Sequence, residues 1–132
     1  MNIDLIILVD DNPVTIFYNK DVVEDLFPGI EILSYESSKE FIDDYLAGMC
    51  SDGKNTLLLL DVNMPEYCGF ETLSELEDEC EELDNLTVLM LTSSSLKVDK
   101  EKATRFVSVK GYIEKPLTEA KLGSIINIPL SK

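Results

Sequence analysis

Histidine is absent from this sequence, and basic residues are few, with 11 lysines and arginines against 26 aspartates and glutamates. Without histidine, the chain cannot form a Ser-His-Asp triad, a zinc site that uses imidazole, or an imidazole general base. The formal net charge of −15 at pH 7 argues against direct nucleic-acid binding through a basic patch. These absences exclude several common classes of enzyme and disfavour a DNA-binding protein.

Cysteines and long apolar runs are also scarce. The three cysteines, Cys50, Cys68 and Cys80, have no paired spacing such as CxxC, which favours reduced thiols in a cytoplasmic protein. The run LIILV is too short for a signal peptide or a membrane span, and no other stretch approaches the roughly 20 apolar residues that a span needs. We therefore expect a cytoplasmic protein without membrane contacts.

The composition that remains is that of an ordinary globular domain. The chain has 132 residues, of which 45% are apolar, and it contains no internal repeat, low-complexity tract or linker. We expect residues 1–132 to form one domain without an output domain. A fragment cut from a longer protein is the alternative.

Short apolar runs alternate with segments of helical spacing along the whole chain. Continuous runs of this kind are typical of strands that are buried on both faces of a parallel sheet. They lie at 5–9, 30–35, 56–60, 86–91 and 111–113. The alternation predicts an α/β fold, namely a (βα)5 doubly wound parallel five-stranded sheet with the flavodoxin-like strand order 2-1-3-4-5.

Five helices are predicted after these runs, and three of them have start signals. Asn12 before Pro13 predicts the first helix, Ser37 with Glu40 forms a capping-box pattern for the second, and Thr118 predicts the N-cap of the fifth. The apolar stripe predicted for the first helix consists of Val14, Tyr18, Val22 and Leu26. The fourth helix, around 97–108, has the weakest apolar face.

Polar side chains that can do chemistry follow the predicted strands at their carboxyl ends. They are Asp10 and Asp11 after the first strand, Asp61 after the third, Thr92 after the fourth and Lys115 after the fifth. In open α/β sheets this edge binds ligands, at the crevice where the strand order reverses. If strands one and three are neighbours there, the three aspartates converge.

Three carboxylates in one pocket need compensating positive charge. Two unit charges ~4 Å apart repel by about 4 kcal/mol at an effective dielectric constant of roughly 20. Lys115 supplies one cation, and an oxygen-rich pocket suits a divalent ion such as Mg²⁺, which binds carboxylates together with phosphate oxygens and water. The sequence therefore predicts a magnesium site that includes Asp10, Asp11 and Asp61.

Four motifs in order, VDD, LLLDVNMPEYCG, LTS and YIEKP, resemble those of the receiver domain of two-component response regulators. The resemblance covers essentially the whole chain and is to stand-alone receivers of the chemotaxis type. It implies that Asp61 is the phosphoacceptor and that Mg²⁺ lies between Asp11 and Asp61, with Asp10 holding it mainly through water. The backbone carbonyl of Asn63 would complete the protein ligands.

The same resemblance implies that Lys115 pairs with phosphoryl oxygens and that Pro116 permits a cis Lys-Pro peptide bond that aims the lysine. Thr92 would bring its hydroxyl to the phosphoryl group, although the two serines after it are alternatives, and Tyr112 would then move inward. Tyr112 fits equally well as a core aromatic. The face of the fourth helix, fifth strand and fifth helix would bind the partner.

The implied phosphodonor is a phosphohistidine on a sensor histidine kinase or a histidine phosphotransfer protein, because this chain has no histidine of its own. The implied output is binding of a downstream protein, or phosphorelay, by a monomer or a phosphorylation-dependent dimer. Such a receiver is not an enzyme that acts on other substrates. It catalyses only its own phosphorylation and slow autodephosphorylation.

Two other functions compete with this interpretation. A Mg²⁺-dependent phosphohydrolase would use Asp61 as nucleophile, but such enzymes place a second acid two residues later, where this chain has Asn63. The other is a receiver-like interaction scaffold that is not phosphorylated. The presence of all the expected motif residues counts against the scaffold.

Overall fold

The computed structural model describes residues 3–48, 53–64, 68–80, 85–92, 106 and 108–126 of the chain. The elements are β1 (Leu5–Val9), α1 (Pro13–Leu26), β2 (Glu31–Tyr35), α2 (Ser38–Ala47), β3 (Thr56–Asp61), α3 (Gly69–Glu79), β4 (Leu86–Thr92), β5 (Val109–Glu114) and α5 (Glu119–Ile126). The helix expected around 97–108 falls almost entirely outside the described residues. Within the described residues, no helix has the length and apolar character that a membrane span requires.

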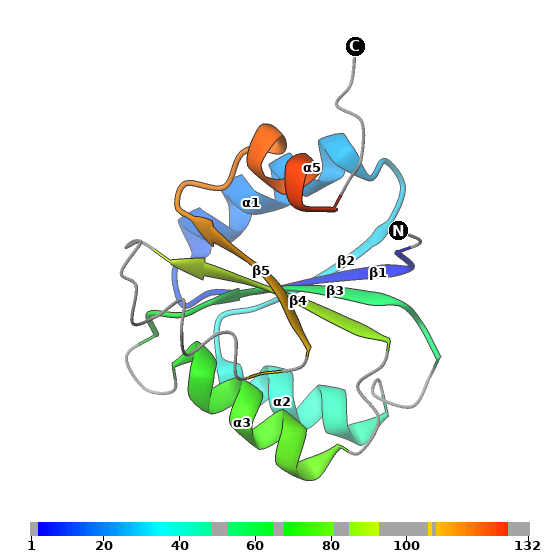
Figure 1. Ribbon diagram of the computed structural model, residues 1–132, viewed down its shortest axis with the longest axis vertical. Helices are drawn as coiled ribbons and strands as arrows, with labels where there is room; N and C mark the ends of the chain where they lie inside the picture. Colours follow the sequence, from blue (N-terminus) through cyan, green and yellow to red (C-terminus); the bar gives the residue numbers. More distant parts are fainter. Residues whose placement is uncertain are drawn as a thin grey trace.

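The five strands in the described residues are all parallel and form one sheet in the order β2-β1-β3-β4-β5 (Figure 1). This confirms the predicted strand order and the α/β fold class. Val9 at the end of β1 lies opposite Leu60 of β3, and Asp61 lies opposite Leu91 of β4. The central strands therefore end at nearly the same level, and the residues after them gather at one edge of the sheet.

Helices cover both faces of the sheet, with α1 and α5 on one face and α2 and α3 on the other (Figure 1). Successive strand residues point to opposite faces, so the apolar residues of β3 contribute to two separate cores. Leu57 and Leu59 pack on the α1–α5 side, whereas Leu58 and Leu60 pack on the α2–α3 side. This double burial is the reason that the strands appear in the sequence as unbroken apolar runs.

Side-chain hydrogen bonds confirm the three predicted helix starts. Asn12, Ser37 and Thr118 each accept a backbone N–H from the first turn of α1, α2 and α5, at 2.9, 3.3 and 3.2 Å. Pro13 is the first residue of α1, where its missing N–H costs no hydrogen bond. Because N–H groups in a first helical turn have no partner within the helix, local sequence is enough to mark these positions.

The predicted apolar stripe of α1 is wrong at two of its four positions. Val14 and Tyr18 are 73% and 45% exposed, and the neighbouring Phe17 is 78% exposed. The buried residues of α1 are Ile16, Asn19, Val22 and Val23. The buried stripe includes the polar residue Asn19. A search for evenly spaced apolar residues therefore favours the adjacent, exposed face of the helix.

Candidate functional site

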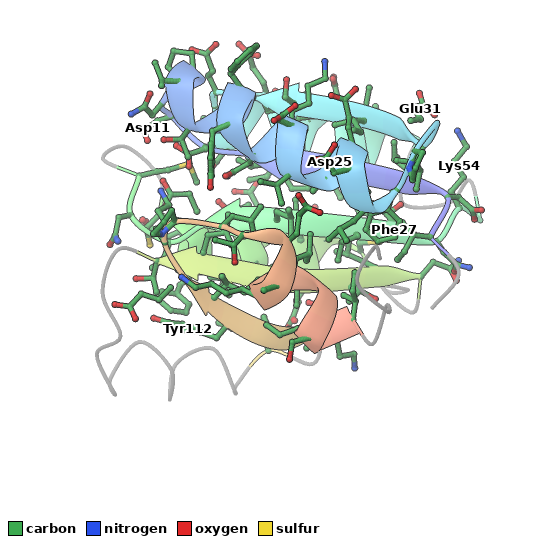
Figure 2. All side chains as sticks on the ribbon, turned by 90° about the horizontal axis from the view of Figure 1, so that it is seen from above. Asp11, Asp25, Phe27, Glu31, Lys54 and Tyr112 are labelled. Atoms are coloured by element: carbon green, nitrogen blue, oxygen red, sulfur yellow. The ribbon has the colours of Figure 1, made fainter. Side chains whose placement is uncertain are left out.

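The polar residues that the sequence places after the strands gather at the carboxyl end of the sheet. Asp10 and Asp11 directly follow β1, Asp61 ends β3, and Lys115 directly follows β5. Figure 2 shows Asp11 at this end of the molecule and Lys54, which precedes β3, at the opposite end. The site is therefore built from turns and strand ends that the parallel sheet brings together.

Three carboxylates form an acidic cluster that consists of Asp10, Asp11 and Asp61. One carboxylate oxygen of each residue lies within 4.8 Å of the others. Asp10 and Asp61 are buried, whereas Asp11 is exposed. The predicted convergence of the three aspartates is confirmed, and one member of the acidic cluster remains open to solvent.

Lys115 provides an ammonium group between the two buried carboxylates. Its Nζ lies 3.1 Å from Asp10 Oδ2 and 3.2 Å from Asp61 Oδ1. Its backbone N–H donates to the Thr92 carbonyl at 2.6 Å, and the Lys115–Pro116 peptide bond is cis, as the resemblance implies. The lysine is thus attached to β4 through its backbone and to the acidic cluster through its side chain.

Backbone N–H groups also hold the two buried carboxylates. Asn12 N–H donates to Asp10 Oδ1 at 2.9 Å, and Asn63 N–H donates to Asp61 Oδ1 at 3.1 Å. The contacts that Asp61 receives from Lys115 and from Asn63 both go to Oδ1, so neither of them occupies Oδ2. The Asp61 carboxylate is therefore anchored and oriented through one of its two oxygens.

Burial raises the pKa of the Asp61 carboxyl above its ordinary value of 3.8, and the charge of Asp10 raises this pKa further. Lys115 and the Asn63 N–H act in the opposite direction without cancelling the shift. Burial by itself lowers the pKa of Lys115, but the carboxylates of Asp61 and Asp10 outweigh that effect and raise it. The Lys115 ammonium therefore does not offset the combined effect of burial and the Asp10 charge on Asp61.

The donor set of the acidic cluster fits a hard divalent cation. Carboxylate oxygens are the protein ligands that Mg²⁺ prefers, together with water and phosphate oxygens. Carboxylates at the 4.8 Å limit repel by roughly 3 kcal/mol at an effective dielectric constant of about 20, and a bound cation would offset this repulsion. Asp10, Asp11 and Asp61 are therefore the residues that could hold Mg²⁺.

Thr92 and Tyr112 lie on the two strands at the β5 edge of the sheet. Thr92 is the fully buried last residue of β4, opposite Glu114 of β5. Tyr112 lies opposite Met90, and its half-buried side chain packs against the α2–α3 core. Thr92 is thus linked to the site through the N–H of Lys115, whereas the position of Tyr112 agrees with either interpretation of that residue. The two serines after Thr92 lie outside the described residues.

Gly69 lies beside the site, and the sequence motifs assigned it no role. It is the first residue of α3, and its N–H donates to the Val62 carbonyl at 3.1 Å. A Cβ on Gly69 would lie 2.8 Å from the Asp61 carbonyl oxygen and 3.1 Å from Val62 Cα. Only glycine permits this close approach. In the sequence Gly69 ends the motif LLLDVNMPEYCG, but its close approach to Asp61 depends on how α3 packs and could not be predicted from that motif.

Known proteins resemble this chain in both sequence and fold. Residues 6–127 match the family model of the response regulator receiver domain. The polar-differentiation response regulator DivK of Brucella ovis is 28% identical over 113 residues, which cover 86% of this chain and 85% of DivK. A two-component response regulator from Cytophaga hutchinsonii has a TM-score of 0.84 at 26% identity, with 96% of each chain covered.

The Vibrio cholerae chemotaxis protein CheY4 has the same fold, with a TM-score of 0.76 at 19% identity over 98% of this chain and 100% of CheY4. The family match spans most of the sequence, and both solved structures align over nearly the whole chain. The protein therefore belongs to the response regulator receiver domain family of two-component signalling.

Proposed function

We propose that this receiver is switched by phosphorylation of Asp61, with Mg²⁺ as its cofactor. The observation that carries the proposal is the meeting of a buried aspartate, two further carboxylates within 4.8 Å and a lysine ammonium at 3.2 Å. This combination supplies a nucleophile, ligands for a cation and a positive charge for phosphoryl oxygens at one point.

Asp61 would act as the nucleophile through its less restrained oxygen. Because Lys115 and Asn63 both hold Oδ1, we expect Oδ2 to attack phosphorus. A P–O bond forms to Asp61 while the P–N bond to the donor histidine breaks and the imidazole leaves. Lys115 is then placed to pair with a phosphoryl oxygen as a point charge.

The proposed ligands of Mg²⁺ are Asp10, Asp11, Asp61 and the backbone carbonyl of Asn63. When bound, Mg²⁺ neutralises charge on the transferring phosphoryl group and on the acidic cluster. Asp10 already uses one oxygen for a backbone N–H and the other for Lys115, which supports a contact through water for this residue. Asp11 is exposed and is the carboxylate most open to an incoming ion.

The proposed phosphodonor is a phosphohistidine on a sensor histidine kinase or a histidine phosphotransfer protein. Arrival of the phosphoryl group would draw the Thr92 hydroxyl toward it, and Tyr112 would then move into the vacated space. The hydrogen bond from Lys115 N–H to the Thr92 carbonyl supports a link between the site and these strands. The proposed output surface is the face of β5, α5 and the predicted fourth helix, and that helix lies almost entirely outside the described residues.

Incubation with acetyl phosphate and Mg²⁺, followed by intact mass measurement, tests the proposal. We expect wild type to gain the mass of one phosphoryl group, in an adduct that is stable in acid and labile in base. Asp61→Asn should gain none, because an amide is not a nucleophile of comparable strength, and EDTA should prevent the reaction in wild type. Asp43→Asn changes an exposed aspartate of α2 and serves as the matched control.

The other outcomes of this experiment separate the competing functions. Sustained release of phosphate from many phosphoesters would support a phosphohydrolase with Asp61 as its nucleophile. Failure to form any adduct, with no spectral response to beryllofluoride, would support a scaffold that is not phosphorylated.

Exposed apolar side chains on α1 indicate where a protein phosphodonor would dock. Val14, Phe17 and Tyr18 form this α1 apolar patch, and Val14 and Tyr18 also line a groove of about 490 Å³ together with Lys115 and Pro116. Apolar side chains three and four residues apart on one helix suit packing against a partner helix. The groove is continuous with the lysine of the site, so a donor that reaches Asp61 would cover the patch.

Phe17→Ala is therefore expected to slow transfer from a phosphorylated histidine phosphotransfer protein by about tenfold, as for a modest interface hot spot. Acetyl phosphate is too small to need the patch, so its reaction rate should stay close to that of wild type. Both rates are measured by intact mass, with Glu24→Ala, at an exposed position near the other end of α1, as the control. Equal losses with both donors would contradict a docking role for the patch.

A further inference from the structure

Lys121 occupies a position that helix electrostatics disfavours. Helix α5 begins at Glu119, and the Thr118 hydroxyl that caps it accepts the N–H of Lys121 at 3.2 Å. Lys121 is therefore the third residue of the helix, where the positive end of the helix dipole favours acidic side chains and capping boxes place Glu or Gln. We therefore expect a contact that offsets the unfavourable interaction between the Lys121 ammonium and the helix dipole.

The compensating contact is with the loop that carries Lys115. The Lys121 Nζ donates to the carbonyl oxygens of Glu114 and Pro116, each at 3.0 Å. These two carbonyls belong to the residues directly before and after Lys115. One ammonium group on α5 therefore joins both sides of the Lys115 backbone to the same helix, and hydrogen bonds to a charged donor are stronger than those between neutral groups.

The two contacts act together with a third restraint on the same residue. The Lys115 N–H donates to the Thr92 carbonyl at 2.6 Å, which ties the loop to the end of β4. Three hydrogen bonds thus restrain the Lys115 N–H and the carbonyls of the two adjacent residues. From this backbone the Lys115 side chain reaches Asp10 and Asp61 at 3.1 and 3.2 Å. A lysine side chain has many rotamers, so the position of its backbone largely decides where its ammonium can reach.

We infer that Lys121 is a positioning residue for Lys115. It holds the loop so that the Lys115 ammonium meets the phosphoryl group on Asp61, and it touches neither the substrate nor the acidic cluster. This role rests on the proposed phosphorylation of Asp61. Loss of the Lys121 ammonium should slow phosphorylation by acetyl phosphate by roughly tenfold, because small displacements of a catalytic group have large effects on rate.

Lys121→Met and Lys121→Arg test the inference, with Lys39→Met as the control for loss of one positive charge at an exposed position. Methionine keeps an apolar stem without donors, whereas arginine keeps a charged group that can donate to two carbonyls. We expect slow phosphorylation in Lys121→Met, recovery in Lys121→Arg and a wild-type rate in Lys39→Met. Intact mass against time at saturating Mg²⁺ gives the rates.

A second measurement needs no phosphodonor. Hydrogen exchange of the Lys115 N–H, followed by NMR in the unphosphorylated protein, should be faster in Lys121→Met and restored in Lys121→Arg. If wild type forms no adduct, the proposed function fails, while the exchange rates still support or overturn the positioning role. Wild-type phosphorylation and exchange in Lys121→Met would overturn the inference, even if the melting temperature fell.

Discussion

The Lys115→Met variant is expected to lose about 3 kcal/mol of unfolding free energy at neutral pH, in addition to most of its reactivity with phosphodonors. Methionine removes the ammonium group that lies 3.1 Å from Asp10 and 3.2 Å from Asp61, and both of these carboxylates are buried. Breaking a buried ion pair costs roughly 3–5 kcal/mol, and the lower end applies here because the Lys115 side chain is 24% exposed.

The pH dependence of this loss follows from the directions of the two pKa shifts. The pKa of Asp61 is raised in the folded protein, so the folded state binds more protons and is relatively favoured as the pH falls toward 3.8. The pKa of Lys115 is raised above 10.5, so its ion pairs are intact below 10.5 and are lost as the pH rises through the folded-state value. The variant should therefore be most destabilised between the folded-state pKa of Asp61, which lies above 3.8, and that of Lys115, which lies above 10.5, and it should approach wild type in acid.

Urea unfolding of the metal-free proteins at several pH values measures this effect. Lys39→Met is the control for net charge, and Asp61→Asn in the Lys115→Met background should restore part of the lost stability by removing one unpaired carboxylate. An unfolding midpoint for Lys115→Met that equals that of wild type at pH 7 would show that the ion pairs contribute no net stability.

Gly69→Ala is expected to destabilise the protein by about 1–3 kcal/mol and to slow phosphorylation of Asp61 by roughly tenfold or more. The new methyl group would lie 2.8 Å from the Asp61 carbonyl oxygen and 3.1 Å from Val62 Cα. Both neighbours are backbone atoms, which cannot rotate away as a flexible side chain can. The end of β3 must shift, and the Asp61 carboxylate shifts with it.

Gly48→Ala is the matched control, because a Cβ at that position has no atom within 4 Å. The unfolding free energy from urea denaturation and the rate of reaction with acetyl phosphate are the two measurements. Wild-type values for both in Gly69→Ala would mean that α3 can move away from β3 without disturbing Asp61.

Much of the fold could be predicted because its signals are local. A strand buried on both faces requires a continuous apolar run, and a helix start requires a side chain that accepts an unpaired N–H. The limits of β5 were less accurate: the prediction covered 111–113, whereas the strand spans Val109–Glu114. Its ends include Lys110 and Glu114, which are exposed, so the apolar pattern does not extend over the whole strand.

Short-range patterns in the sequence were enough to predict the order of strands and helices along the chain and the kinds of chemical group that end each strand. Packing between the elements sets three features that these patterns did not predict: α1 exposes Val14, Phe17 and Tyr18, Gly69 lies close to the backbone of Asp61, and Lys121 bridges the carbonyls around Lys115. Each of these features depends on the distance between packed elements. The packing of the sheet against its two helical layers sets that distance, and it cannot be predicted from the residue pattern of a single segment.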